Sequence, residues 1–221
     1  MFSALVPAYN GGERVAVKLT PDSGRVRNDY NLTDELGRNG APVPRLYDLP
    51  RLCLSSVGVF LERSMTARDY RRFTSALKCD ARWGHFKRSC GACGSFLVIY
   101  SELFDGPLES LPVDVQLGLF KRTLACLEDA ALALPAAIVL HNDLALRNIL
   151  YRHDAGADNY ELVVIDFELA TTVAKTEANE MQLYNYVLDF MLAKYPTYRA
   201  DSSEVDVSQP VVLREPFVEV F

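Results

Sequence analysis

Two carboxylates and one amide stand at spacings that suit phosphoryl transfer. In the segment HNDLALRN, Asp143 lies five residues before Asn148, and Asp166 follows an apolar run further along the chain. Phosphoryl transfer needs a carboxylate beside the attacking hydroxyl, oxygen ligands for Mg²⁺ and a cation on the phosphates. This spacing lets Asp143 meet a substrate while Asn148 meets a metal, and Asp166 would supply the main metal carboxylate.

Two short apolar strands and one long helix are expected to position these groups. Residues 138–140 and 162–165 predict two strands, each ending at one of the polar motifs, with a turn at 154–159. Residues 113–134 carry apolar side chains at helical spacing, which predicts one long core helix with Asp114 or a neighbour as its cap.

A second helix is predicted over residues 177–195 and is ended by Pro196. Its apolar face would consist of six side chains: Met181, Tyr184, Val187, Leu188, Met191 and Leu192. Upstream, residues 96–100 predict a strand, and residues 102–107 predict a polar turn with the character of a hinge.

The N-terminal part of the chain predicts a hairpin followed by a weak helix. The turn Asn10-Gly11-Gly12 would join two strands, with Lys18 near the end of the second. The helix, over residues 26–36, is expected to be short or frayed, because residues that break helices follow it: Gly37, Gly40, Pro42 and Pro44.

The polar motifs resemble a known family. HNDLALRN followed by VIDFE is similar to the catalytic loop and metal-binding motif of the protein-kinase-like superfamily, which includes aminoglycoside and choline phosphotransferases as well as atypical fungal-type kinase-like proteins. The residues that carry the match are His141, Asp143, Asn148, Asp166 and Phe167.

The resemblance implies a role for each site residue. Asp143 would be the catalytic base, and Asn148 and Asp166 would bind Mg²⁺. Lys18, in the segment VAVK, would contact the α- and β-phosphates of ATP and complete the catalytic set. The backbone of Glu102 and Leu103, in SFLVIYSELFDG, would hold the adenine.

The sequence also departs from the family pattern. No glycine-rich GxGxxG loop precedes VAVK, the position before Asp143 is Asn142 rather than arginine, and Glu168 replaces the glycine after Asp166-Phe167. Glu168 and the length of the chain resemble the small-molecule phosphotransferase branch more than regulated protein kinases. Asp29 matches best in register as the acidic partner of Lys18, with Asp34 and Glu35 as alternatives, and each is equally well explained as a solvated helix acid.

The expected fold class is α+β, with the two lobes of a protein-kinase-like fold. A reduced N-terminal sheet lobe would span residues 1–100 with an insertion at 50–94, and a hinge would follow at 101–107. A mostly helical catalytic lobe would span 108–200, and residues 201–221 would form a tail.

Composition limits the partners and the compartment. With 221 residues and a net charge of −6, the chain is long enough for a sizeable core and too acidic for a surface that tracks nucleic acid or anionic lipid. No apolar run is long enough to cross a bilayer, and five cysteines in a chain of this length suit a reducing compartment. We therefore expect an intracellular, cytoplasmic protein with no nucleic-acid or membrane partner. The resemblance adds ATP as its ligand.

Two clusters lie within the expected insertion. Cys79, His85, Cys90 and Cys93 are possible zinc ligands, but their spacing is loose and favours loop and packing residues. The basic run at residues 68–72 is expected to be a solvated face.

The resemblance thus implies an enzyme: a kinase that uses ATP and Mg²⁺ to phosphorylate a hydroxyl group of a protein or a small molecule. The alternative is a pseudokinase or truncated kinase domain that works as a binding scaffold, suggested by the missing glycine-rich loop. Retention of Lys18, Asp143, Asn148 and Asp166 together favours the enzyme, because a scaffold has no chemical need for all four.

Overall fold

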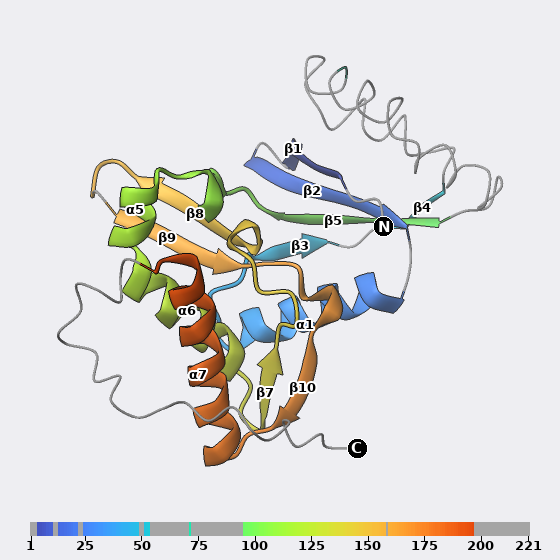
Figure 1. Ribbon diagram of the computed structural model, residues 1–221. Helices are drawn as coiled ribbons and strands as arrows, with labels where there is room; N and C mark the ends of the chain where they lie inside the picture. The colour runs from blue at the N-terminus through green and yellow to red at the C-terminus, as the bar shows by residue number, and fades with distance from the viewer. Residues whose placement is uncertain are drawn as a thin grey trace. The chain divides into compact units, whose positions relative to one another are not determined.

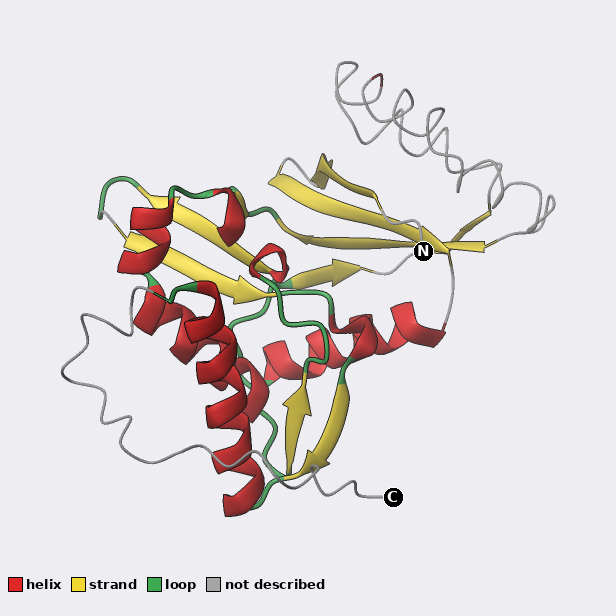
Figure 2. Cartoon of the chain, in the orientation of Figure 1, coloured by secondary structure: helices red, strands yellow, loops and turns green. Residues whose placement is uncertain are grey.

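The computed structural model describes residues 4–10, 13–21, 24–48, 51–53, 71, 95–157 and 159–196. Most of the expected insertion, including the cysteine cluster and most of the basic run, lies outside these residues, as do Gly11, Gly12 and the tail at 201–221. Within them the fold is α+β, with helices and small antiparallel sheets along the chain (Figures 1 and 2).

Residue contacts divide the chain into two compact units. Unit 1 comprises Met1–Asn31 and Pro44–Phe104, and unit 2 comprises Leu32–Val43 and Asp105–Phe221. The last boundary between the units, after Phe104, therefore falls inside residues 101–107, the predicted hinge. The lobe boundaries themselves stay a prediction.

Unit 1 is built on one antiparallel sheet. The expected hairpin is present: β1 (Ala4–Asn10) pairs with β2 (Glu13–Pro21), and β2 pairs on its other edge with β5 (Ser95–Glu102). Two three-residue strands, β3 (Leu46–Asp48) and β4 (Arg51–Cys53), also pair with β5. Lys18 stands opposite Leu5 and Ile99, and β2 continues for three residues beyond it.

Helix α1 (Gly24–Arg38) is longer than the sequence predicts. Its fifteen residues include Gly37, which the sequence analysis took as a helix breaker. The helix ends at Arg38, and Gly40 follows in the left-handed conformation with a φ of 79°. There the Ala41 N–H donates to the Leu36 carbonyl and the Gly40 N–H to the Gly37 carbonyl, a Schellman motif that satisfies the last carbonyls. Burial of Leu32 and Leu36 in a hydrophobic core stabilises the helix despite its weak intrinsic tendency.

The long helix predicted over residues 113–134 is two helices in the structure. They are α5 (Val113–Gly118) and α6 (Phe120–Leu132), preceded by the single turn η2 (Leu108–Ser110). Leu119 separates them with a ψ of 2°, outside the helical range, and it follows Gly118, a residue that weakens helices. The expected cap is also wrong, because Pro112 occupies the N-cap and no side chain caps the helix.

The β-strands of unit 2 form two small antiparallel sheets. One contains β6 (Gly106–Pro107), β8 (Ile149–Asp154) and β9 (Asn159–Val164), and the other pairs β7 (Ala137–Leu140) with β10 (Thr171–Ala174). The two strands expected at 138–140 and 162–165 are therefore present as parts of β7 and β9. The turn near residues 154–159 joins β8 to β9, and the sequence analysis missed β8 and β10.

Helix α7 (Glu177–Lys194) has the predicted extent, but a different face is buried. Asn179, Leu183, Val187 and Met191 are almost fully buried, whereas Met181 is 60% exposed. The prediction that Met181 and Tyr184 belong to the core face is therefore wrong. Residues spaced by four positions lie on one side of a helix, and this side of α7 packs against α6 (Figure 1).

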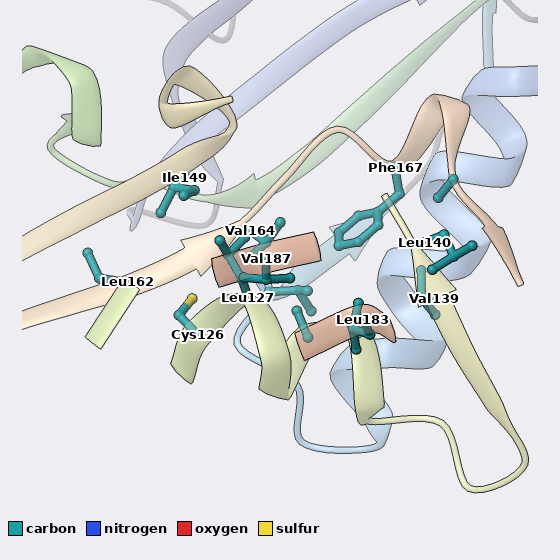
Figure 3. Packing of buried hydrophobic residues seen from close by; sticks show 14 of the residues in the cluster. Cys126, Leu127, Val139, Leu140, Ile149, Leu162, Val164, Phe167, Leu183 and Val187 are labelled. Atoms are coloured by element: carbon teal, nitrogen blue, oxygen red, sulfur yellow. The ribbon is translucent and has the colours of Figure 1, made fainter. Parts of the chain in front are cut away.

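The core of unit 2 lies beneath the predicted catalytic segments. Side chains from α6, β7, β9 and α7 meet there with Phe167, as Figure 3 shows. A small cavity is lined partly by these residues and partly by His141, Leu144 and Tyr186. Among the described residues, no helix is long and apolar enough to cross a membrane.

Candidate active site

The segment HNDLALRN connects β7 to β8 in unit 2. It leaves the buried strand β7 at His141 and ends in the single turn η3 (Leu146–Asn148). Asn142 adopts a φ of 59°, a conformation that asparagine tolerates better than most residues. Its side-chain N–H group donates to the Leu169 carbonyl and to Thr171 Oγ1, both at 3.0 Å. These bonds fix the start of the loop to the chain that follows Asp166.

His141 joins the two polar motifs. Its Nδ1 accepts a hydrogen bond from the Asp143 backbone N–H at 3.3 Å. The neutral ring therefore carries its proton on Nε2, which lies 2.9 Å from the Ile165 carbonyl oxygen and donates to it. The ring is buried and packs on Phe167, with 5.0 Å between ring centroids. One side chain thus holds the backbone at Asp143 and the residue before Asp166.

The Asp143 carboxylate is held by two neighbours. Arg147 Nη2 lies 3.0 Å from each of its oxygens, and Asn148 Nδ2 lies 3.2 Å from Oδ2. The Asp143 side chain is 37% exposed and that of Arg147 is 55% exposed, so the pair faces solvent.

The Asn148 side chain is held in place through its amide nitrogen. It is buried, and its Nδ2 also donates to the Asp143 carbonyl at 2.9 Å. The Ile165 N–H donates to the Asn148 carbonyl at 2.9 Å, which ties the end of the loop to the segment before Asp166. Both contacts of the Asn148 amide group are made by its nitrogen. Its oxygen, Oδ1, makes no hydrogen bond to the described residues.

Asp166 adopts the left-handed conformation, with a φ of 71° and a ψ of 56°. This backbone geometry is uncommon for residues other than glycine, and it occurs often at functional sites. The turn η4 (Phe167–Leu169) follows directly, and Phe167 anchors it in the core (Figure 3). Because Ile165 bonds both His141 and Asn148, the structure brings Asp143, Asn148 and Asp166 into one part of unit 2.

Tyr186 is a neighbour of the site that the sequence analysis missed. It lies on α7, is 36% exposed and lines the small cavity together with His141 and Leu144. Burial, and secondarily the charge of Asp143, raises the pKa of the Tyr186 hydroxyl. No local signal identifies this residue, because 43 positions separate it from Asp143 and only the packing of α7 places it there.

Lys18 in unit 1 has an acidic partner. Its Nζ lies 2.9 Å from Asp29 Oδ2 on α1, and the two side chains are 18% and 9% exposed. Asp34 pairs instead with Arg38, and Glu35 is exposed. Asp29 is therefore the partner among the three candidates and is not a solvated acid. An arrangement of this kind holds the lysine ammonium in one position.

The predicted adenine contacts are partly engaged within unit 1. The Glu102 N–H donates to the Arg45 carbonyl at 3.0 Å, and Glu102 Oε2 accepts from the Arg45 N–H. The Glu102 carbonyl oxygen also accepts a hydrogen bond from Ser101 Oγ at 3.4 Å. Adenine binding at Glu102 and Leu103 stays a prediction.

Comparison with known proteins gives limited information. No family model matches the chain, and no curated protein matches it. A solved structure, described as WaaP in complex with acyl carrier protein, is similar at 15% sequence identity and a TM-score of 0.44. The match covers 86% of this chain and 66% of that chain, so this chain spans just under two thirds of the neighbour's length.

Proposed function

We propose that the chain is a phosphotransferase of protein-kinase-like fold that moves the γ-phosphate of ATP to a hydroxyl group of a protein or a small molecule. One observation carries the proposal. Asp143 and Asn148 are hydrogen-bonded to each other, in a loop that His141 ties to the residue before Asp166. It supports the proposal because phosphoryl transfer requires a base near metal ligands: Asp143 is bonded to Asn148, and backbone bonds tie the loop to the residue before Asp166. The two-lobe architecture belongs to the same proposal.

In the proposed reaction, Asp143 orients the acceptor hydroxyl and receives its proton. The hydroxyl oxygen forms a bond to the γ-phosphorus while the bond from that phosphorus to the bridging oxygen breaks. The electron pair of the broken bond leaves with ADP. Catalysis of this kind depends mainly on positioning, which here comes from the Asn148 bond to the Asp143 carboxylate and the His141 bond to the Asp143 backbone.

The donor atoms fit a hard divalent cation. Asn148 Oδ1 and the Asp166 carboxylate are oxygen ligands of the kind that Mg²⁺ prefers, and they would hold it. When bound, Mg²⁺ would offset charge on the phosphates. We assign Lys18, held by Asp29, to the α- and β-phosphates and the backbone of Glu102 and Leu103 to adenine. These roles are part of the proposal.

The second candidate function is a binding scaffold of kinase-like fold. One observation favours it: Arg147 covers both oxygens of Asp143. In a scaffold the Asp143–Arg147 pair would be a permanent structural contact. Nucleotide binding distinguishes the two functions.

The first test is the melting temperature of the full chain with ATP, in the presence of Mg²⁺ or of a chelator. A ligand at 100 times its Kd stabilises the folded state by about 2.7 kcal/mol, so a shift of several degrees is expected with Mg²⁺. Asp166→Asn should remove the magnesium-dependent part of the shift. Asp114→Asn is the matched control, because Asp114 is an exposed acid on α5 outside the loop.

A magnesium-dependent shift that Asp166→Asn abolishes and Asp114→Asn preserves supports the phosphotransferase. Absence of any shift in the intact chain contradicts it and favours the scaffold. An equal shift in the chain and in Asp166→Asn would show that Asp166 does not bind the metal.

A further inference from the structure

Arg147 makes an unusual use of its guanidinium group. One nitrogen, Nη2, lies 3.0 Å from both Asp143 oxygens. A guanidinium has five N–H donors, so the two on Nη2 leave three on Nη1 and Nε. These three make no hydrogen bond to the described residues, and the side chain is 55% exposed. The guanidinium group therefore binds Asp143 through Nη2 and keeps the donors on Nη1 and Nε for another partner.

The contact also affects the proposed base. Arg147 and Asn148 together donate three hydrogen bonds to the Asp143 carboxylate. An acceptor hydroxyl must compete with these donors for the same oxygens. Stability does not require the contact, since an exposed ion pair four residues apart contributes little to folding. A second anion near Arg147 would draw the guanidinium toward itself and leave Asp143 open.

We infer that the acceptor of this site carries an anionic group, a phosphate monoester or a carboxylate, close to the hydroxyl that is phosphorylated. Arg147 binds that group through Nη1 and Nε, and its Nη2 then leaves the Asp143 carboxylate. Guanidinium matches both anions in geometry and charge. Arrival of the correct acceptor thus frees the base, and a neutral alcohol leaves Arg147 on Asp143. This inference rests on the proposed function and names the substrate class of the same site.

The binding step is tested with inorganic phosphate as the probe. Its dissociation constant is measured by phosphorus NMR for the full chain and for three variants: Arg147→Gln, Asp143→Asn and Arg152→Gln. Arg152 is the matched control, because it forms a comparable exposed pair with Glu161 at 3.0 Å between β8 and β9. Comparison among the variants removes the contribution of phosphate bound elsewhere.

The variants are expected to change the affinity for phosphate in opposite directions. Arg147→Gln weakens phosphate binding about 10-fold or more, since it removes the charged donor. Asp143→Asn binds phosphate about 2- to 5-fold more tightly than the intact chain, because the competing carboxylate is gone. Arg152→Gln leaves binding unchanged. Binding that is no tighter in Asp143→Asn, or is retained in Arg147→Gln, overturns the inference. The Asp143→Asn result decides it even if Arg147→Gln does not fold.

The catalytic step is tested with three small alcohols: glycerol, glycerol 3-phosphate and glycerate. The inference expects kcat/KM for one or both anionic acceptors to exceed that for glycerol at least 10-fold, and expects Arg147→Gln to lose this preference. The two anionic acceptors separate a phosphate site from a carboxylate site. Equal kcat/KM for all three overturns the inference. If the chain neither binds magnesium-ATP nor transfers phosphate, the proposed function fails, and the phosphate titration still decides the role of Arg147.

Discussion

A single histidine determines how the polar groups of the candidate site meet. His141 uses both ring nitrogens on backbone groups, the Asp143 N–H and the Ile165 carbonyl. Both partners lie next to residues assigned to chemistry. The histidine itself touches no acceptor in the proposed mechanism, so it is a positioning residue.

Replacement of His141 by leucine should destabilise unit 2 and disrupt the site. Leucine fills similar space but leaves the Asp143 N–H and the Ile165 carbonyl without their partner, at a cost of about 2–4 kcal/mol in the free energy of unfolding. The magnesium-ATP shift in melting temperature should also decrease. Denaturant unfolding followed by circular dichroism measures the first effect.

His153→Leu is the control for this prediction. His153 is exposed on β8 and stacks on Tyr160 with 4.4 Å between ring centroids. Its replacement should cost less than about 1 kcal/mol. Equal losses in the two variants would show that the His141 hydrogen bonds contribute nothing specific.

The sequence predicts individual site residues, but only those that belong to short motifs. The spacing of Asp143, Asn148 and Asp166 predicted residues that the structure does bring together. Arg147 is only four residues from Asp143, but it lies in a loop, where this spacing alone does not predict an ion pair. Tyr186 reaches the site through the packing of α7, which no local pattern predicts.

At the scale of elements, the buried side of α7 shows where apolar periodicity misleads. Asn179 is polar yet fully buried, because its Nδ2 donates to the Ala174 carbonyl and its N–H to Thr176 Oγ1. Met181 is apolar yet exposed. A prediction based on hydrophobicity alone therefore assigns the wrong side of α7 to the core.

Two methionines on this helix provide a direct test. Met191 is fully buried, and its replacement by alanine should lower the free energy of unfolding by about 2–5 kcal/mol through lost contacts and a cavity. Met181→Ala makes the same chemical change at a position that is 60% exposed, and it should cost less than about 0.5 kcal/mol. Urea denaturation of both variants measures the difference. Comparable losses would contradict the observed rotation of α7.

Other elements were missed for physical reasons that can be named. The second half of strand β8 consists of the polar residues Arg152, His153 and Asp154, so the strand lacks the apolar run that would identify it. Strand β10 has only four residues, and it is stabilised by pairing with β7 rather than by its own composition. The hairpin of β1 and β2 was predictable because its turn signal and apolar flanks are adjacent in sequence.

At the scale of the whole molecule, some residues early in the sequence belong to the core of the later part of the chain. Leu32, Leu36 and Val43 precede most of unit 1 in sequence, yet they belong to the core cluster that α6 and α7 build. The Val164 N–H donates to the Pro42 carbonyl, which joins this early segment to β9. Such long-range pairing leaves no local signal. The α+β class could be predicted because each element carries its own periodicity, whereas the assignment of segments to units depends on contacts between distant residues.

The stability of unit 2 should fall at alkaline pH because of one buried thiol. Burial, together with the charge of Asp129, raises the pKa of Cys126 on α6 from 9.0 to about 12. Below pH 9.0 the thiol is protonated in both states, and between these two values only the unfolded chain releases its proton. The unfolded state is thereby favoured, by at most about 1.4 kcal/mol for each pH unit.

Cys126→Ala isolates this effect, because other titrating groups contribute equally to the variant and to the intact chain. The variant should be less stable at about pH 8 owing to lost packing, and the difference should shrink toward about pH 10.5. Leu127→Ala is the matched control: Leu127 is the next residue of α6, is equally buried and does not titrate, so its deficit should stay constant. Urea unfolding at several pH values measures both. A constant deficit for Cys126→Ala would mean that the thiol ionises as readily in the folded protein as in the unfolded chain.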